Sequence, residues 1–148
     1  MSYVCYKCGI QLKVSESRGR KYYICPKCSY AISKHRLKWA RRRLKGVRRS
    51  NKILDVYEEV YRNTLTDQKH TEFVCPLCKT KTVYETPYKQ LVCSKCLLVI
   101  KQGHRVPKEI KEQVVKLHRE EGYQYTELIR KFCLSPSMVH SILVRQRD

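Results

Sequence analysis

Apolar doublets recur along the first hundred residues, and each stands directly before a pair of cysteines. The doublets are Tyr3-Val4, Tyr23-Ile24, Phe73-Val74 and Leu91-Val92. A short strand that leads into a tight turn has this form, because a few apolar residues supply the small core that a unit of about thirty residues can build. The pattern predicts two copies of one hairpin unit, over residues 1–32 and 64–101, with 64–72 as a polar connector.

Between the two units, apolar residues recur at steps of three and four, which is the period of a helix with one apolar face. The stripe consists of Leu37, Ala40, Leu44, Val47 and Leu54. Ser33 suits the N-cap, and Gly46 is a weak point at which we expect a bend. The spacing predicts one long helix over residues 33–63.

From Pro107 onward the pattern is helical again. Pro107 suits a first helical position and Gly122 suits the residue just past the end of that helix. A short helix is predicted from Thr126 to Phe132, and Ser135-Pro136 opens a last one. Its buried residues should be Val139, Ile142 and Leu143. Three helices with a short turn before the last are the helix-turn-helix arrangement, here over residues 102–148.

Eight of the nine cysteines fall into four Cys-x-x-Cys pairs. Sixteen residues separate the first two pairs and fourteen the last two, so each half of the chain has the spacing of a four-thiolate zinc site. The predicted ligands are Cys5, Cys8, Cys25 and Cys28 in the first unit, and Cys75, Cys78, Cys93 and Cys96 in the second. We therefore expect two zinc ions per chain and a small metal-stabilised α+β fold: two zinc ribbons, a linking basic helix and a C-terminal three-helix domain.

A disulfide framework would be the competing reading of these cysteines. Two cysteines separated by two residues are poorly placed for an ordinary disulfide bond with each other, but they are well placed to bind one metal ion together. Residues 1–9 contain no apolar run typical of a signal peptide, and no stretch approaches the length of a membrane span. We expect an intracellular protein in a reducing compartment, cytoplasm or nucleus, with no membrane partner.

The net charge of +19 is unevenly placed, since residues 1–52 hold 16 Lys and Arg against a single acid, Glu16. Like charges along one helix destabilise it unless a partner neutralises them, so we expect nucleic acid to do so. A solvated helix face is the alternative. The residues predicted to contact phosphates are Arg36, Lys38, Arg41, Arg42, Arg43, Lys45, Arg48 and Arg49.

The stretch from Gly122 to Leu143 resembles the helix-turn-helix of insertion-sequence transposases, resolvases and small transcription regulators. The resemblance implies that the last helix lies in the DNA major groove, where the side chains able to reach DNA are Ser137, Met138, His140, Ser141 and Arg145. Cys133 stands where the family has a turn glycine, so we expect a distorted turn. The ribbons resemble those of some insertion-sequence transposases and of archaeal and eukaryotic general transcription factors.

The sequence holds no acidic trio, phosphate-binding glycine loop or paired nucleophile and base typical of an enzyme. We expect a non-enzymatic zinc-dependent protein that binds double-stranded DNA and regulates transcription. Two alternatives stay open: an accessory or inhibitor protein that binds RNA polymerase or another protein through its ribbons, and the DNA-binding part of a transposase-like protein. A homodimer is also left open.

Overall fold

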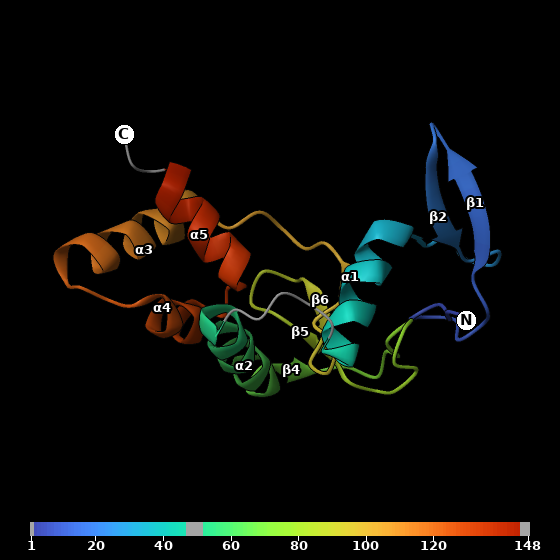
Figure 1. Cartoon of the computed structure of the whole chain (residues 1–148), viewed down its shortest axis with the longest axis horizontal. Helices are drawn as coiled ribbons and strands as arrows, with labels where there is room; N and C mark the ends of the chain where they lie inside the picture. The colour runs from blue at the N-terminus through green and yellow to red at the C-terminus, as the bar shows by residue number, and fades with distance from the viewer. Residues whose placement is uncertain (1, 47–51, 146–148) are drawn as a thin grey trace.

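Two small antiparallel sheets and five helices make up the part of the chain that the structure, a computed structural model, describes: residues 2–46 and 52–145. The β1–β2 hairpin lies at one end of the long axis of the molecule and α3 lies at the other (Figure 1). The small α+β class with two four-cysteine clusters is as predicted.

The first sheet has the order β1-β2-β3, with β1 at Lys13–Ser17, β2 at Arg20–Ile24 and β3 at Ala31–Ser33. The hairpin turn consists of Arg18 and Gly19, both with positive φ (52° and 76°). Two left-handed residues give the turn the same twist as the strands on either side, which keeps the hairpin closed.

The second sheet has the order β4-β5-β6-β7. Its strands are β4 (Lys69–His70), β5 (Val83–Glu85), β6 (Leu91–Cys93) and β7 (Val99–Lys101). The predicted connector over 64–72 is wrong, because a helix continues to Thr66 and β4 begins at Lys69. The polar residues there are satisfied internally: the Thr64 hydroxyl donates to the Val60 carbonyl at 2.7 Å, and the Thr71 hydroxyl to the Val83 carbonyl at 2.9 Å.

The prediction of one helix over residues 33–63 is also wrong. Helix α1 spans Lys34–Lys45 and ends at Gly46, which is left-handed (φ 65°), and α2 spans Lys52–Thr66. Glycine adopts this conformation without a Cβ penalty, and its N–H caps the carbonyls of the last turn, so the chain leaves the helix axis there. The Ser33 N-cap is confirmed, since its hydroxyl accepts the Arg36 N–H at 3.2 Å.

The two helices serve two different cores. Leu37 and Ala40 of α1 are buried with both ribbons, whereas Tyr61 and Leu65 of α2 are buried with the C-terminal helices. Leu44, which belonged to the predicted stripe, is 43% exposed. Val47 lies outside the described residues, as do Arg48 and Arg49.

The two ribbons pair with each other through reciprocal hydrogen bonds. The Val4 N–H donates to the Pro76 carbonyl (3.2 Å), and the Val74 N–H donates to the Tyr6 carbonyl (3.1 Å). Val4 and Val74 are equivalent positions of the repeat, and so are Tyr6 and Pro76. The contact is therefore self-complementary, like the interface of a two-fold dimer, although both halves belong to one chain.

The C-terminal helices are α3 (Lys108–Glu120), α4 (Tyr125–Phe132) and α5 (Pro136–Arg145). Val139, Ile142 and Leu143 are buried, as predicted. Helix α2 packs against both α4 and α5, so this core is built from four helices and not from the last three alone.

We expected a distorted turn between α4 and α5, but the turn has ordinary backbone geometry. Cys133 is left-handed (φ 51°, ψ 49°) and buried, so the backbone adopts the conformation usual at a helix C-terminus in spite of the Cβ. A non-glycine residue in this conformation costs on the order of 1–2 kcal/mol, which the burial of Cys133 and Leu134 offsets.

The burial of Leu37 between the ribbons can be tested by measuring stability. We expect Leu37→Ala to lower the free energy of unfolding by about 2–5 kcal/mol, because it leaves a cavity between the ribbons. The matched control is Leu44→Ala on the same helix, which should change it by less than about 0.5 kcal/mol. Urea denaturation of the zinc-loaded protein measures both, and equal effects would contradict the two-core arrangement.

Candidate functional site

Each Cys-x-x-Cys pair forms the same tight turn, which we call a knuckle. The N–H of its first cysteine donates to the carbonyl five residues later, and the N–H four residues later donates back to that cysteine. The residue four positions after the first cysteine is left-handed in all four knuckles: Gly9, Ser29, Lys79 and Leu97. Only the first knuckle has a glycine there, so the other three maintain this backbone with side chains present.

The knuckles bring the sulfur atoms together in two clusters. Site 1 consists of Cys5, Cys8, Cys25 and Cys28, and site 2 of Cys75, Cys78, Cys93 and Cys96; within each, all Sγ atoms lie within 4.8 Å of one another. Sγ–Sγ distances are 3.6 Å for Cys5 and Cys28 and 3.7 Å for Cys75 and Cys96. Tetrahedral zinc with Zn–S bonds of about 2.3 Å requires sulfurs about 3.8 Å apart. Each site could hold a zinc ion, two per chain, as the sequence predicts.

Hydrogen bonds surround the sulfurs of both sites. Backbone N–H groups donate to the Cys5, Cys25, Cys75 and Cys93 sulfurs at 3.4–3.5 Å. The Thr82 hydroxyl lies 3.1 Å from the Cys93 sulfur. It can donate a hydrogen bond to this sulfur when Cys93 is a thiolate. Hydrogen bonds from the Cys75, Cys78 and Cys96 thiols, with a smaller contribution from Thr82, lower the pKa of Cys93. These donors stabilise the anionic form that binds metal.

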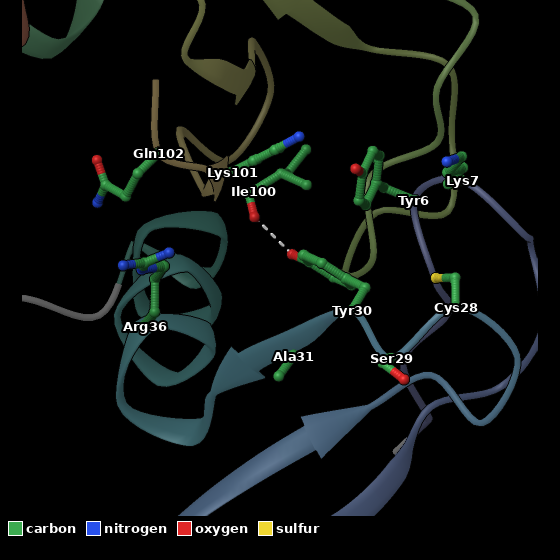
Figure 2. Close-up of a pocket in the computed structure, with 10 residues that line it drawn as sticks. All are labelled: Tyr6, Lys7, Cys28, Ser29, Tyr30, Ala31, Arg36, Ile100, Lys101 and Gln102. Atoms are coloured by element: carbon green, nitrogen blue, oxygen red, sulfur yellow. Dashed lines mark hydrogen bonds between the residues drawn. The ribbon is translucent and has the colours of Figure 1, made fainter. Parts of the chain in front are cut away.

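The two sites differ in exposure. Cys93 and Cys96 of site 2 are fully buried, whereas Cys28 of site 1 is exposed and Cys8 half-buried. Cys28 lines an open hollow of about 400 Å³ between the ribbons and α1. Figure 2 shows Cys28 and Lys7 on one side of this hollow and Arg36 and Gln102 on the other. Solvent and chelators therefore reach site 1 more easily than site 2.

Cys133, the ninth cysteine, lies apart from both sites. Burial raises its pKa to about 11, so at neutral pH it stays a thiol inside the helical core.

Several of the predicted phosphate contacts on α1 instead face inward. Arg36 donates to the Val99 carbonyl (3.2 Å), and Arg43 donates to the carbonyls of Cys96 and Leu97 (3.0 and 3.1 Å). Arg41 donates to the Tyr3 hydroxyl at 3.4 Å. Arg43 also lies 4.0 Å from Glu58, which links α1 to α2. These arginines hold the second ribbon and both helices together.

The outward side of α1 carries Lys38, Arg42 and Lys45, all exposed. The Arg42 guanidinium lies over the ring of Trp39, 5.3 Å from its centroid, and Trp39 is itself 44% exposed. An aromatic ring beside cations is a surface that nucleic acids fit.

A basic groove of about 580 Å³ separates this side of α1 from β2. No acidic residue is among those that line it: Arg20, Lys21, Tyr22, Ser33, Lys34, His35 and Lys38. Arg20 and Lys21 were not among the predicted DNA contacts. Their charge was visible in the sequence, but only the packing of the hairpin on α1 brings it beside Lys38.

On α5, the structure exposes Ser137, His140, Ser141 and Arg145, and Met138 is half-buried. A second groove of about 530 Å³ runs along this helix. Arg105 and Lys111 line its opposite wall, and neither was predicted as a site residue. They come from segments outside the last helix, so the pattern of that helix could not reveal them.

Two four-thiolate sites on paired knuckles define a metal-binding protein built from zinc ribbons. The family model described as acetone carboxylase gamma subunit matches residues 1–92, more than half of the chain, and the protein belongs to this family. The match covers site 1, the first knuckle of site 2, and both α1 and α2. Comparison with curated proteins and with solved structures gave no match. In the described residues, no helix has the length and apolar character needed to cross a membrane.

Metal content tests both sites. We expect elemental analysis to find two zinc ions per chain. A chelator should remove one rapidly and the other slowly, because Cys28 of site 1 is exposed, whereas every ligand of site 2 is buried or half-buried. Cys28→Ser should abolish the fast phase and Cys96→Ser the slow one, as a chromogenic zinc indicator would record. A single phase in the unaltered protein would contradict the difference between the sites.

Proposed function

We propose that this protein is a non-enzymatic, zinc-dependent regulator of transcription that binds double-stranded DNA. The basic groove between β2 and α1 would contact phosphates, and α5 would read base edges. The observation that carries the proposal is the accumulation of cations in a groove lined by no acidic residue.

The charge argument rests on the outward side of α1. Lys34, Lys38, Arg42 and Lys45 are exposed within twelve residues, and Arg20 and Lys21 of β2 line one groove with Lys34 and Lys38. Close cations repel one another, which destabilises the free protein, and a row of phosphates relieves this repulsion. Released counterions then make the affinity strongly dependent on salt.

The arrangement of α3, α4 and α5 supports α5 as the reading element. Its apolar face is buried in the helical core, while Ser137, His140 and Ser141 point outward near its start. Hydroxyl and imidazole groups can exchange hydrogen bonds with base edges in the major groove. None of these is an Arg or Asn, so discrimination should be about 1 kcal/mol per base, and a dimer with two α5 helices would be needed for a tight site.

Membership of the family favours a second candidate. The family takes its name from a subunit of acetone carboxylase, so a role as a non-catalytic subunit that binds protein partners through its ribbons is the alternative. RNA polymerase would be one such partner for a regulator. Purification of the tagged protein with and without nuclease treatment separates the two roles: partners retained after nuclease treatment are bound directly.

The outward cations give a quantitative test. Replacing Lys38, Arg42 and Lys45 together with Gln should lower the slope of log affinity against log salt by roughly 2.7, since each lost phosphate contact removes about 0.9 of a counterion. A triple variant of Lys69, Lys81 and Lys89 in the second ribbon removes the same charge and should leave the slope unchanged. Fluorescence anisotropy with a labelled duplex measures both, and equal slopes would mean that the α1 surface is only solvated.

Base reading by α5 is tested separately. We expect His140→Ala to change the preferred sequence, obtained by selection from a random duplex pool, with the salt slope intact. Arg145→Ala should lower the slope and leave the preferred sequence unchanged, because Arg145 lies about two turns beyond Ser137, at the far end of α5, where we expect a phosphate contact. If neither substitution changed either property, α5 would not contact DNA, and the protein-binding role would be favoured.

A further inference from the structure

Residues 102–107 join β7 to α3, and we call this segment the strap. It lies against the turn between β5 and β6. The His104 N–H donates to the Tyr88 carbonyl at 2.8 Å. Gly103 lies so close to the backbone of Tyr88, Lys89 and Gln90 that a Cβ at this position would overlap with it. A glycine is therefore required for the strap to follow this path.

The turn that receives the strap is itself firmly held. Backbone hydrogen bonds of 2.9 Å join Thr86 with Gln90 and Lys89 with Thr86, and the buried Thr86 hydroxyl accepts the Gln90 N–H at 3.2 Å. The chain then enters β6, whose last residue is the zinc ligand Cys93. Site 2 is thus connected to the strap through one short strand and one hydrogen-bonded turn.

Beyond its anchor, the strap forms one wall of the groove along α5. Val106 is buried and fixes the end of the strap to the helical core. Arg105 and Lys111 line this groove together with Arg145, Ser137 and Ser141 of α5. No acidic residue is among those that line this groove, and within the described residues none of the three cations forms an ion pair.

We propose that this groove binds backbone phosphates of the DNA strand beside α5, through Arg105, Lys111 and Arg145, and that the second zinc ribbon positions Arg105 through the strap. This inference rests on the proposed function. Three cations and two hydroxyls in one open groove complement the negative charges and hydrogen-bond acceptors of a phosphodiester backbone. The ribbon would then fix the register in which α5 meets the bases.

The first experiment compares two cations that line the groove with a lysine that does not. Lys111→Gln and Arg105→Gln should each lower the salt slope of duplex binding by about 0.9, because each removes one phosphate contact. Lys116→Gln is the matched control, since Lys116 is exposed on α3 and does not line the groove, and its slope should equal that of the unaltered protein. Slopes for Lys111→Gln and Arg105→Gln equal to the control would overturn the inference while duplex binding itself persisted. Absence of any duplex binding by the unaltered protein would overturn the proposed function as well.

The second experiment tests the role of the strap. Gly103→Ala should displace the strap, lower the slope as Arg105→Gln does, and leave the two zinc ions in place. Combining Gly103→Ala with Arg105→Gln should add no further loss, because both act on one contact. Gln102→Ala is the control for the segment. Additive losses, or a Gly103→Ala protein with an unchanged slope, would show that the strap does not position Arg105.

Discussion

The bond between thiolates and a metal ion is the interaction on which the rest of this structure depends. Four thiolates held within 4.8 Å repel one another, and short strands with at most three apolar residues each bury too little surface to oppose that repulsion and the chain entropy. Zinc converts the repulsion into coordination. Each ribbon then becomes a surface on which Leu37 and Ala40 of α1 can pack, and the second ribbon also carries the strap that leads to the C-terminal helices.

The positive charge of the chain serves two purposes that its sequence does not separate. Arg36 and Arg43 donate to carbonyls of Val99, Cys96 and Leu97, which belong to the last knuckle or follow it directly. Guanidinium groups suit this task because their donors lie in a fixed planar fork. Lysines predominate on the outward side, for which we propose phosphate contact, and a compact charge on a flexible stem suits that task.

Family membership and the proposed DNA binding concern largely different segments. The family match covers residues 1–92, whereas α3, α4 and α5 lie beyond it. Helix α2 joins the two parts, because it lies within the matched region and packs against α4 and α5. A ribbon module of the family is thereby fixed to a helical unit, and the groove along α5 combines residues from the strap, α3 and α5.

The sequence by itself determined the two metal sites, the knuckles and the buried face of α5, because these depend on local spacing: two residues between paired ligands, and steps of three and four residues from Val139 to Ile142 and Leu143. Only the tertiary structure decided how the basic segment is divided. A continuous apolar period passed through Gly46, but the two halves of the segment face different cores, and the left-handed glycine separates them. The structure likewise decided which arginines turn inward and that Arg105 and Arg145 line one groove, since these facts depend on carbonyls and segments distant in the chain, which no local pattern encodes.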